Sequence, residues 1–376
     1  MQRVTQADIA KALNISQPTV GLVVGRTTGR RGKEKLRPET IERILKKAEE
    51  MGYRPHRHAQ IMRHGKAALI GLVYSGGLLS VASERAVQVT RILKERGYGI
   101  VSYDTQWHRG GIQEALAYMD DSKVAGVLMA GNFYLPEEVR CQEEWSLPLV
   151  GVAAPEIAGT SLVRCDMRAG TLQITEHMLT QGCRLLVHLS AGEADVPLEN
   201  WRWQRARLAA GFQDAVLAAG GRVVVCRAED YQKQVKRVAG GSGPLGVILC
   251  QSELERELPA FDPFFRGAEM AKSLLGRAPL PEAVVCPNDD WAYGFAIEVL
   301  RAGHSIPRDV AVAGFNDSAL GQRFLVPLTT VRQPTQAMCE LAVRLLLDEI
   351  DGKPSAPRTY DLPGELIVRA SSIKAA

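Results

Sequence analysis

The spacing of hydrophobic positions divides the chain into two parts with different periods. Over roughly the first fifty residues, apolar side chains recur three and four positions apart, as along one face of an α-helix. This spacing predicts helices over residues 6–13, from residue 17 onward, and from Pro38 or Glu39 to Met51. From residue 68 on, short and nearly continuous apolar runs alternate with helical stretches. The pattern therefore predicts a small all-α domain followed by an α/β core.

Polar residues between the first helical stretches mark where these helices begin and end. Thr5 is expected to cap the first helix, with Asp8 three positions on in its first turn. Asn14 suits the left-handed residue that ends a helix. Ser16 is expected to cap the second helix, with Pro18 in its first turn, where the missing N–H costs little. Two short helices joined by a tight turn, with a third to support them, form a helix-turn-helix domain.

The rest of the chain reads as repeated strand–helix units. The expected strands are ALIGLVY, YGIVSYD, VAGVLMAG, LPLVGVA, LLVHLS, RVVVCRA, AVVCPND and DVAVAGFND. Helical stretches lie between them, over residues 84–96, 170–181, 202–219 and 291–302. Near-continuous apolar strands separated by helices predict parallel sheets covered on both faces, which is a doubly wound architecture. The number of units favours two sheets, and ligands of such folds bind beyond the carboxyl ends of the strands.

Charge is concentrated in the first part of the chain. Residues 1–66 hold 15 Lys and Arg against 6 Asp and Glu, a net charge of +9, whereas the remainder has a net charge of −5. The loop at residues 26–37 is especially basic and includes Arg30 and Arg31. A basic head on a mildly acidic body favours binding to a polyanion such as DNA. The alternative for the basic head is a solvated surface that binds no polyanion. The alternative for the loop at residues 26–37 is a mobile segment that binds nothing.

Several classes of protein are disfavoured by what the sequence lacks. No apolar run approaches the roughly 20 residues of a membrane helix, and the N-terminus lacks the apolar core of a secretory signal, so we expect a cytoplasmic protein without membrane contacts. The seven cysteines form no CxxC pair and are expected to be small buried residues, with no metal site and no cofactor. The GSGPLG run at residues 241–246 precedes a strand instead of following one, so it does not indicate nucleotide binding. We expect no catalytic residues.

Longer motifs resemble those of the LacI/GalR family of repressors. The head matches in VTQADIAKALNISQPTVGLVVG, and the hinge in the spacing YRP-x3-A-x2-M-R-x-G, which begins at Tyr53. The core matches in EAVVCPNDDWAYGFAIEVLRAGHSIPRDVAVAGFNDS, PLTTVRQP and LPGELIVRASS. The resemblance implies a DNA-binding domain at residues 1–54, a hinge helix at 55–66 and a sensor core at 67–376 that is periplasmic-binding-protein-like, type I. Its first lobe would comprise residues 67–165 and 328–352, and its second lobe 166–327 and 355–376.

In the head, the resemblance implies which residues meet DNA. The second helix would enter the major groove, with Gln17, Pro18 and Leu22 facing bases and Thr19 and Gly21 near phosphates. The hinge would place Met62 as a wedge in the minor groove, with Ala59 beside it. The remaining residues expected at the DNA are Thr5, Ser16, Arg30, Arg31, Tyr53 and Arg57. The chain departs from the family at Gly21-Leu22, where Ser-Arg is usual, and Leu22 lacks the bidentate guanine contact of an arginine.

In the core, the resemblance implies a small molecule, most plausibly a sugar or sugar derivative, between the lobes. The expected ligand contacts are Tyr74, Asp104, Trp201, Arg207, Asn288 and Asn316. Asn316 stands where the family has an aspartate, so it can donate as well as accept hydrogen bonds. Arg207 is offset by one residue from the family's arginine. Residues 229–260, with the apolar run LGVILC, exceed the compact family pattern and form either an additional strand or a peripheral loop.

The favoured function is a homodimeric transcription repressor that binds a pseudo-palindromic operator in double-stranded DNA and responds to a carbohydrate effector. Paired recognition helices would occupy successive major grooves about one helical turn apart. One alternative is a small-molecule receptor without gene regulation, which leaves the basic head unexplained. The other is an enzyme on an α/β scaffold. Its only support is the carboxylates at strand ends, Asp104, Asp166 and Asp289.

Overall fold

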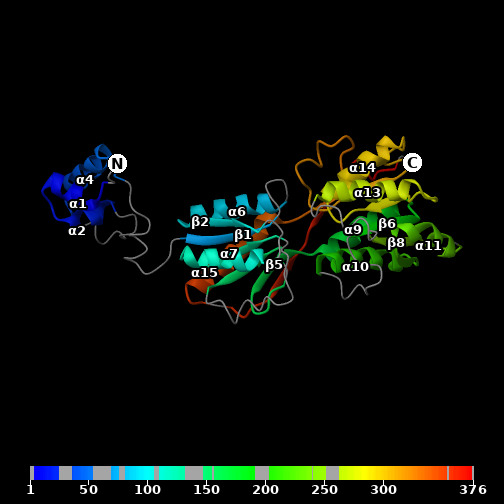
Figure 1. Cartoon of the computed structure of the whole chain (residues 1–376), viewed down its shortest axis with the longest axis horizontal. Coiled ribbons are helices and arrows are strands. Elements are labelled where there is room, and N and C mark those ends of the chain that lie inside the picture. The colour runs from blue at the N-terminus through cyan, green and yellow to red at the C-terminus, as the bar shows by residue number, and fades with distance from the viewer. Residues whose placement is uncertain are drawn as a thin grey trace. The chain divides into compact units, whose positions relative to one another are not determined.

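The chain forms two compact units, residues 1–68 and residues 69–376, in a computed structural model (Figure 1). The structure describes residues 4–24, 36–53, 69–75, 81–105, 110–131, 147–154, 156–190, 203–238, 240–250, 262–353 and 355–374.

The first unit is a small helical domain. Its helices are α1 (Gln6–Leu13), α2 (Gln17–Val24) and α4 (Pro38–Glu50). Each contributes a fully or nearly fully buried side chain to one apolar cluster, namely Ile9, Val20 and Ile44, because the apolar positions of each helix recur on a single face. The three predicted helices are therefore confirmed.

The second unit begins with a parallel sheet in which six strands are described. Their order is β12-β5-β4-β3-β1-β2. Their bounds are β1 (Leu69–Tyr74), β2 (Gly99–Asp104), β3 (Val127–Ala130), β4 (Leu149–Val152), β5 (Ser161–Cys165) and β12 (Thr359–Leu362). Helices α6 (Val81–Glu95) and α15 (Thr335–Ile350) pack on one face, and α7 (Gly111–Asp121) packs on the other. Successive residues such as Leu72 and Val73 thus enter different apolar clusters.

A second parallel sheet follows, and its described strands have the order β10-β9-β6-β8-β7. The strands are β6 (Leu185–Ser190), β7 (Arg222–Arg227), β8 (Leu245–Cys250), β9 (Ala283–Val285) and β10 (Ala311–Ala313). Helices α9 (Met167–Thr180) and α10 (Trp203–Ala218) pack on one face. The other face carries α11 (Tyr231–Val238), α13 (Pro263–Leu275) and α14 (Asp289–Arg301). The predicted class, a helical domain followed by two doubly wound parallel sheets, is confirmed.

The chain passes between the sheets in a way that differs from the expected lobe bounds. Strand β12 pairs with β5 in the first sheet, so the assignment of all of residues 355–376 to the second lobe is wrong for this strand. Residues 329–332 run beside β10 of the second sheet, and β11 (Thr330–Arg332) pairs antiparallel with β13 (Glu365–Ile367). Edge pairing decides these placements, and it cannot be read from the period of one strand.

Residues 229–260, for which the sequence analysis allowed either an additional strand or a peripheral loop, contain a central strand. LGVILC forms β8, which lies between β6 and β7 and is paired with both along its length. Its residues from Gly246 to Cys250 are buried, as expected of a strand covered on both faces. This run is therefore part of the sheet and not a peripheral loop; residues 251–261 lie outside the described residues.

Two pairs of helices cross at glycines that allow close backbone approach. A Cβ atom on Gly211 of α10 would overlap the Arg168 carbonyl of α9. A Cβ atom on Gly294 of α14 would likewise overlap the Phe264 carbonyl of α13. These glycines let each pair of helices lie close together on its own face of the second sheet.

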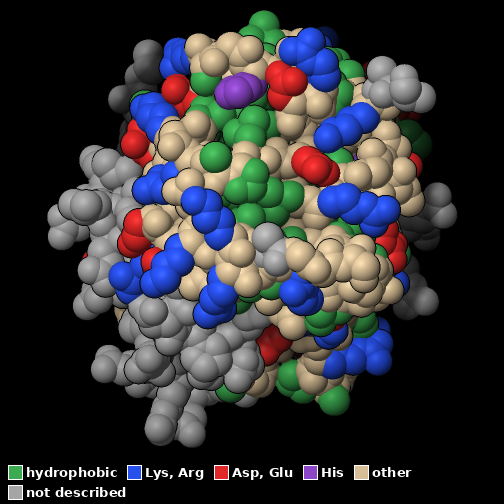
Figure 2. Space-filling view, turned by 90° about the vertical axis from the view of Figure 1, so that its right-hand side faces the viewer, with side chains coloured by type: hydrophobic (Ala, Val, Ile, Leu, Met, Phe, Trp, Pro, Cys, Tyr) green, Lys and Arg blue, Asp and Glu red, His purple; other side chains and the backbone are tan. Residues whose placement is uncertain are grey.

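None of the described helices is long and apolar enough to cross a bilayer. On the face shown in Figure 2, basic and acidic side chains are interspersed around a narrow strip of hydrophobic ones. Six cysteines are buried and unpaired, as predicted for small apolar residues (Cys165, Cys183, Cys226, Cys250, Cys286 and Cys339); Cys141 lies outside the described residues.

Candidate functional site

In the first unit, capping residues define both ends of α1 and the start of α2. Thr5 and Asp8 form a capping box in which Thr5 N donates to Asp8 Oδ2 at 2.8 Å and Asp8 N donates to Thr5 Oγ1 at 3.3 Å. Asn14 ends α1 in the left-handed conformation, at φ 52°. Ser16 Oγ accepts from Thr19 N at 3.3 Å and lies 2.7 Å from Thr19 Oγ1. All three predicted caps are confirmed, and those at Asn14 and Ser16 fix the turn between α1 and α2.

Helix α2 is apolar toward the head and polar in its first turn. Val20 and Val23 are buried in the head cluster, whereas Ser16, Gln17 and Pro18 are exposed. Thr19, Gly21 and Leu22 are partly exposed. The residues expected to face DNA thus lie outside the head's core. Tyr53 differs, because it packs against that core and its N–H donates to the Ala48 carbonyl at 2.8 Å.

Some of the predicted residues fall outside the described residues. They are Arg30 and Arg31 of the basic loop, Arg57, Ala59 and Met62 of the expected hinge, and Trp201 in the core.

At the first sheet, Tyr74 and Asp104 end the neighbouring strands β1 and β2 and are paired in register. The next residues along each strand are Ser75 and Thr105, which are 1% and 2% exposed. Thr105 N donates to the Tyr74 carbonyl at 2.9 Å, but the hydroxyls of Ser75 and Thr105 have no hydrogen-bond partner among the described residues. Buried hydroxyls normally have partners, so this edge of the sheet offers polar atoms that the described residues leave unsatisfied.

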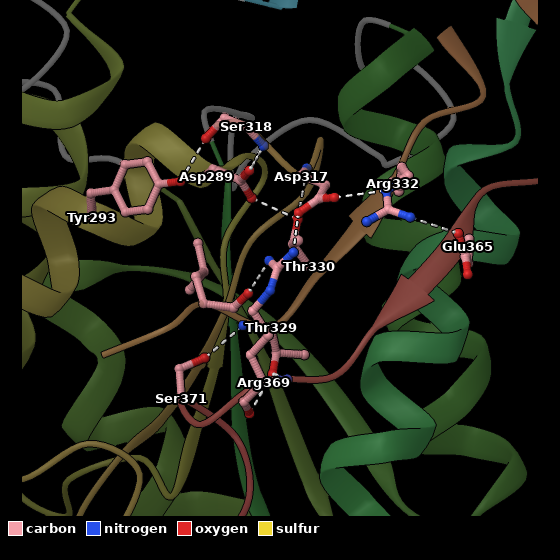
Figure 3. A network of polar contacts seen from close by, with 11 residues as sticks. Asp289, Tyr293, Asp317, Ser318, Thr329, Thr330, Arg332, Glu365, Arg369 and Ser371 are labelled. Atoms are coloured by element: carbon pink, nitrogen blue, oxygen red, sulfur yellow. Dashed lines mark hydrogen bonds and ion pairs between the residues drawn. The ribbon is translucent and has the colours of Figure 1, made fainter. Parts of the chain in front are cut away.

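At the second sheet, Asn288 and Asp289 follow β9 and open α14. Asn288 caps the helix, since its Oδ1 accepts from Trp291 N at 3.0 Å. Asp289 is 1% exposed and accepts from Thr330 Oγ1 at 2.7 Å and from Ser318 N at 2.6 Å (Figure 3). Burial raises the pKa of Asp289 to about 6, although these hydrogen bonds oppose the shift. Asp289 is therefore held within the second lobe.

A second carboxylate in this lobe joins two arginines. Asp317 Oδ1 lies 2.5 Å from Arg369 Nη2, and Asp317 Oδ2 lies 2.8 Å from Arg332 Nε (Figure 3). Arg332 also contacts Glu365 at 3.2 Å, and Arg369 Nη1 donates to the Leu328 carbonyl at 2.8 Å. Sequence analysis missed this network. Its members lie inside the quoted motifs, but spacing alone did not show that residues 317 and 369 meet.

Asn316 is joined to the first lobe by two hydrogen bonds in series. Its Oδ1 accepts from Gln333 Nε2 at 2.5 Å, and Gln333 Oε1 accepts from Arg85 Nη2 at 2.9 Å. Arg85 belongs to α6 of the first sheet, whereas Asn316 follows β10 of the second. Sequence analysis did not single out Arg85 or Gln333, because a lone arginine on an amphipathic helix ordinarily faces solvent.

Arg207 lies where the chain passes from the first sheet to the second. Its Nη2 is 3.2 Å from Asp166 Oδ1 and 3.2 Å from Asp361 Oδ2. Asp166 also caps α9, and Asp361 on β12 pairs with Arg164 at 2.7 Å. Arg207 is thus held by two carboxylates, although its Nε has no acceptor among the described residues.

The predicted core residues therefore fall into separate groups. Tyr74 and Asp104 lie together, Asn316 is linked to Arg85, Asn288 lies next to Asp289, and Arg207 lies with Asp166 and Asp361. Among the described residues, no group of three or more His, Cys, Asp or Glu side chains could hold a metal ion.

Comparison with known proteins places these features in a family. Residues 175–372 match the periplasmic binding protein-like domain. The ribose operon repressor of Halalkalibacterium halodurans is 24% identical over 368 residues, which is 98% of this chain and 97% of that protein. The crystal structure of the Lac repressor dimer bound to operator and the anti-inducer ONPF is 19% identical, with a TM-score of 0.75 over 100% of both chains.

A third relative has been solved with a sugar. The complex of the transcriptional regulator CelR with cellobiose is 24% identical and has a TM-score of 0.63, covering 98% of this chain and 100% of that one. The match over more than half of the chain settles its family. The chain belongs to the family of periplasmic binding protein-like domains, and it has the fold of the LacI-type transcription regulators.

Proposed function

We propose that the protein is a transcription repressor that binds operator DNA through its head and responds to a small molecule bound between the two lobes of its core. The observation that carries the proposal is the first turn of α2, where Ser16, Gln17 and Pro18 are exposed in a unit with a net charge of +9. An exposed polar turn in a unit of positive net charge is suited to the major groove of DNA. The proposal places the protein in the bacterial cytoplasm and assigns it no catalytic residue.

The DNA contacts follow from this placement. Gln17 and Pro18 would meet base edges, and Leu22 would meet a thymine methyl group. Thr19, Gly21, Arg30 and Arg31 would lie at phosphates, which set the register of the protein on DNA. In a homodimer, two copies of α2 would occupy major grooves about one helical turn apart, and Met62 of each hinge would enter the minor groove between them.

The effector site would lie at the carboxyl ends of the two sheets. Tyr74, Asp104, Asn288 and Asn316 supply polar groups there, and the unpartnered hydroxyls of Ser75 and Thr105 support the assignment. The relatives include a ribose operon repressor and a regulator solved in complex with cellobiose, which supports a sugar or sugar derivative as effector. Binding would change how the first lobes of a dimer pack and whether the hinges form, a coupling that is typically about 1–3 kcal/mol.

DNA binding tests the proposal directly. Fluorescence anisotropy with the DNA upstream of the protein's own gene should show specific binding that weakens as salt rises. Gln17→Ala should lower the affinity for that DNA by about tenfold or more, since one base contact is worth about 1–3 kcal/mol, and should leave binding to unrelated DNA unchanged. Glu49→Ala, an exposed change at the end of α4, is the matched control. If the full chain binds no DNA at any salt concentration, the proposal is wrong.

A further inference from the structure

Arg85 is a buried cation without an ionic partner in the part of the chain that the structure describes. It is 6% exposed, in the second turn of α6. Its Nη2 donates to the neutral amide oxygen of Gln333 at 2.9 Å, and its Nε has no hydrogen-bond partner. The neighbouring Glu84 is exposed and forms no ion pair with it among the described contacts.

The other buried arginine of the described residues shows what a satisfied guanidinium looks like in this protein. Arg164 is 4% exposed, and it pairs with Asp361 at 2.7 Å and with Glu156 at 2.8 Å. Burying a charge is costly unless it is paired, and arginine stays protonated in proteins. Burial lowers the pKa of Arg85, as expected of a charge that its surroundings do not compensate. The fold alone therefore gives no reason for a cation at this position.

Hydrogen-bond donors without acceptors among the described residues lie in the chain of contacts that begins at Arg85 and at the edge of the sheet on which its helix packs. Gln333 turns its amide oxygen to Arg85 and its amide nitrogen to Asn316, whose own Oδ1 is thereby occupied. Asn316 is left with its Nδ2 donor, which bonds to none of the described residues. The buried hydroxyls of Ser75 and Thr105 also lack partners at the carboxyl edge of the sheet on which α6 packs. Donors and a positive charge together call for an acceptor that carries negative charge.

We propose that Arg85 is the binding partner of an anionic group on the effector, a carboxylate or a phosphate carried by a sugar-like molecule. The inference deepens the proposed function and rests on it, because it presumes that the effector binds between the two lobes. The guanidinium would form a charge-assisted pair with the anion, and Asn316 would donate to an acceptor of the same molecule.

The test compares arginine variants of the full chain against charged and neutral probes. The probes are glucose 6-phosphate, gluconate, inorganic phosphate and glucose, at constant ionic strength, and the readouts are thermal unfolding and titration calorimetry. At least one anionic probe should bind wild type at least tenfold more tightly than glucose does. Arg85→Met and Arg85→Gln should lose that binding by at least tenfold. Arg91→Met, an exposed arginine on the same helix paired with Glu95, should retain it.

Two arms of the panel distinguish the sources of the charge. A response to gluconate alone would identify a carboxylate, and a response to the phosphates alone would identify a phosphoryl group. Without any probe, both Arg85 variants should melt at or above the temperature of wild type, because they remove an uncompensated buried charge. An equal response of wild type and both variants to every anionic probe, a zero response included, overturns the inference. A lower melting temperature with an unchanged anion response would also overturn it, by giving Arg85 a purely structural role.

DNA binding separates this inference from the function on which it rests. All of the variants should bind the DNA upstream of the gene as wild type does in probe-free buffer, because Arg85 lies in the second unit. If DNA binding and a response to glucose persist while the anions have no effect, only the anionic effector is refuted. If DNA binding is absent, the proposed repressor fails whatever the anions do.

Discussion

The two sheets of the core differ in how their polar groups at the strand ends are satisfied. At the second sheet, Asp289 and Asp317 are buried and each has two or more partners within the lobe. At the first sheet, the hydroxyls of Ser75 and Thr105 are buried without partners among the described residues, and within this part of the chain the side chain of Arg85 donates only to a neutral amide. A satisfied buried network holds a fold together, whereas an unsatisfied one points to a missing partner. We therefore expect the second edge to serve mainly the architecture and, if the proposed effector site is correct, the first edge to serve mainly binding.

The largest effect on stability is expected from removing the charge of Asp317, in the satisfied polar network of the second sheet. Asp317→Asn should lower the free energy of unfolding by about 3–5 kcal/mol, because it leaves the guanidinium of Arg369, whose side chain is only 12% exposed, without its carboxylate. Asparagine tolerates the left-handed backbone of this residue, at φ 54°, so the loss reports the charge and not strain. Urea unfolding measures it. Arg91→Ala, which breaks an exposed pair, should cost at most about 1 kcal/mol, and equal losses would refute the distinction.

The pH dependence of stability tests Asp289. Its folded pKa of about 6 lies above the ordinary value of 3.8, so the folded state binds more protons than the unfolded state between about pH 4 and 6. The protonated carboxyl of Asp289 makes its full contribution to the free energy of unfolding below about pH 4. This contribution falls as pH rises through the window and no longer changes above about pH 6. Relative to Asp289→Asn, which does not titrate, wild type should lose about 2–3 kcal/mol between pH 4 and 7.

Urea unfolding at a series of pH values measures this difference. The exposed variant Asp120→Asn should keep the wild-type profile and serves as the control. A constant gap between wild type and Asp289→Asn across the range would show that folding does not raise the pKa of this carboxyl.

A matched pair of threonines compares the two edges with the same substitution. Thr330→Val removes a hydroxyl that donates to Asp289 at 2.7 Å and should lower the free energy of unfolding by about 1–3 kcal/mol. Thr105→Val removes a buried hydroxyl without a partner and should leave stability unchanged or raise it by up to about 1 kcal/mol. Chemical unfolding of both variants in effector-free buffer checks this. If Thr105→Val is the more destabilising of the two, the two edges do not differ as argued.

The smallest effect on stability is expected in the first unit, at the N-terminal cap of α1, whose contacts join neighbouring residues of one helix. Thr5→Ala removes the capping box of α1 and should lower the local stability of the helix by about 1 kcal/mol. Amide hydrogen exchange of the α1 backbone should detect the change, with Lys11→Ala on the exposed side of the same helix as control. Unchanged protection of the first turn of α1 would mean that the cap does not stabilise the helix.

The site was predictable where its residues are close in sequence. The caps at Thr5, Asn14 and Ser16 follow from a few neighbouring residues, and they formed as expected. Asn288 and Asn316 follow strands whose apolar runs are easily recognised in the sequence. Their positions at strand ends could therefore be predicted. Arg85 and Gln333 were missed, because they are 248 residues apart and neither has a local pattern that indicates the other.

The sequence by itself determined the helical head, the parallel class of the core and the ends of most helices. These depend on the period of apolar positions and on capping residues, which act over a few neighbours. Only the tertiary structure decided that LGVILC is a central strand, that β12 joins the first sheet, and that Asp317 meets Arg369. Strand order and buried ion pairs depend on which surfaces meet after the chain has folded back on itself, and a linear pattern of hydrophobic and polar residues does not specify that meeting.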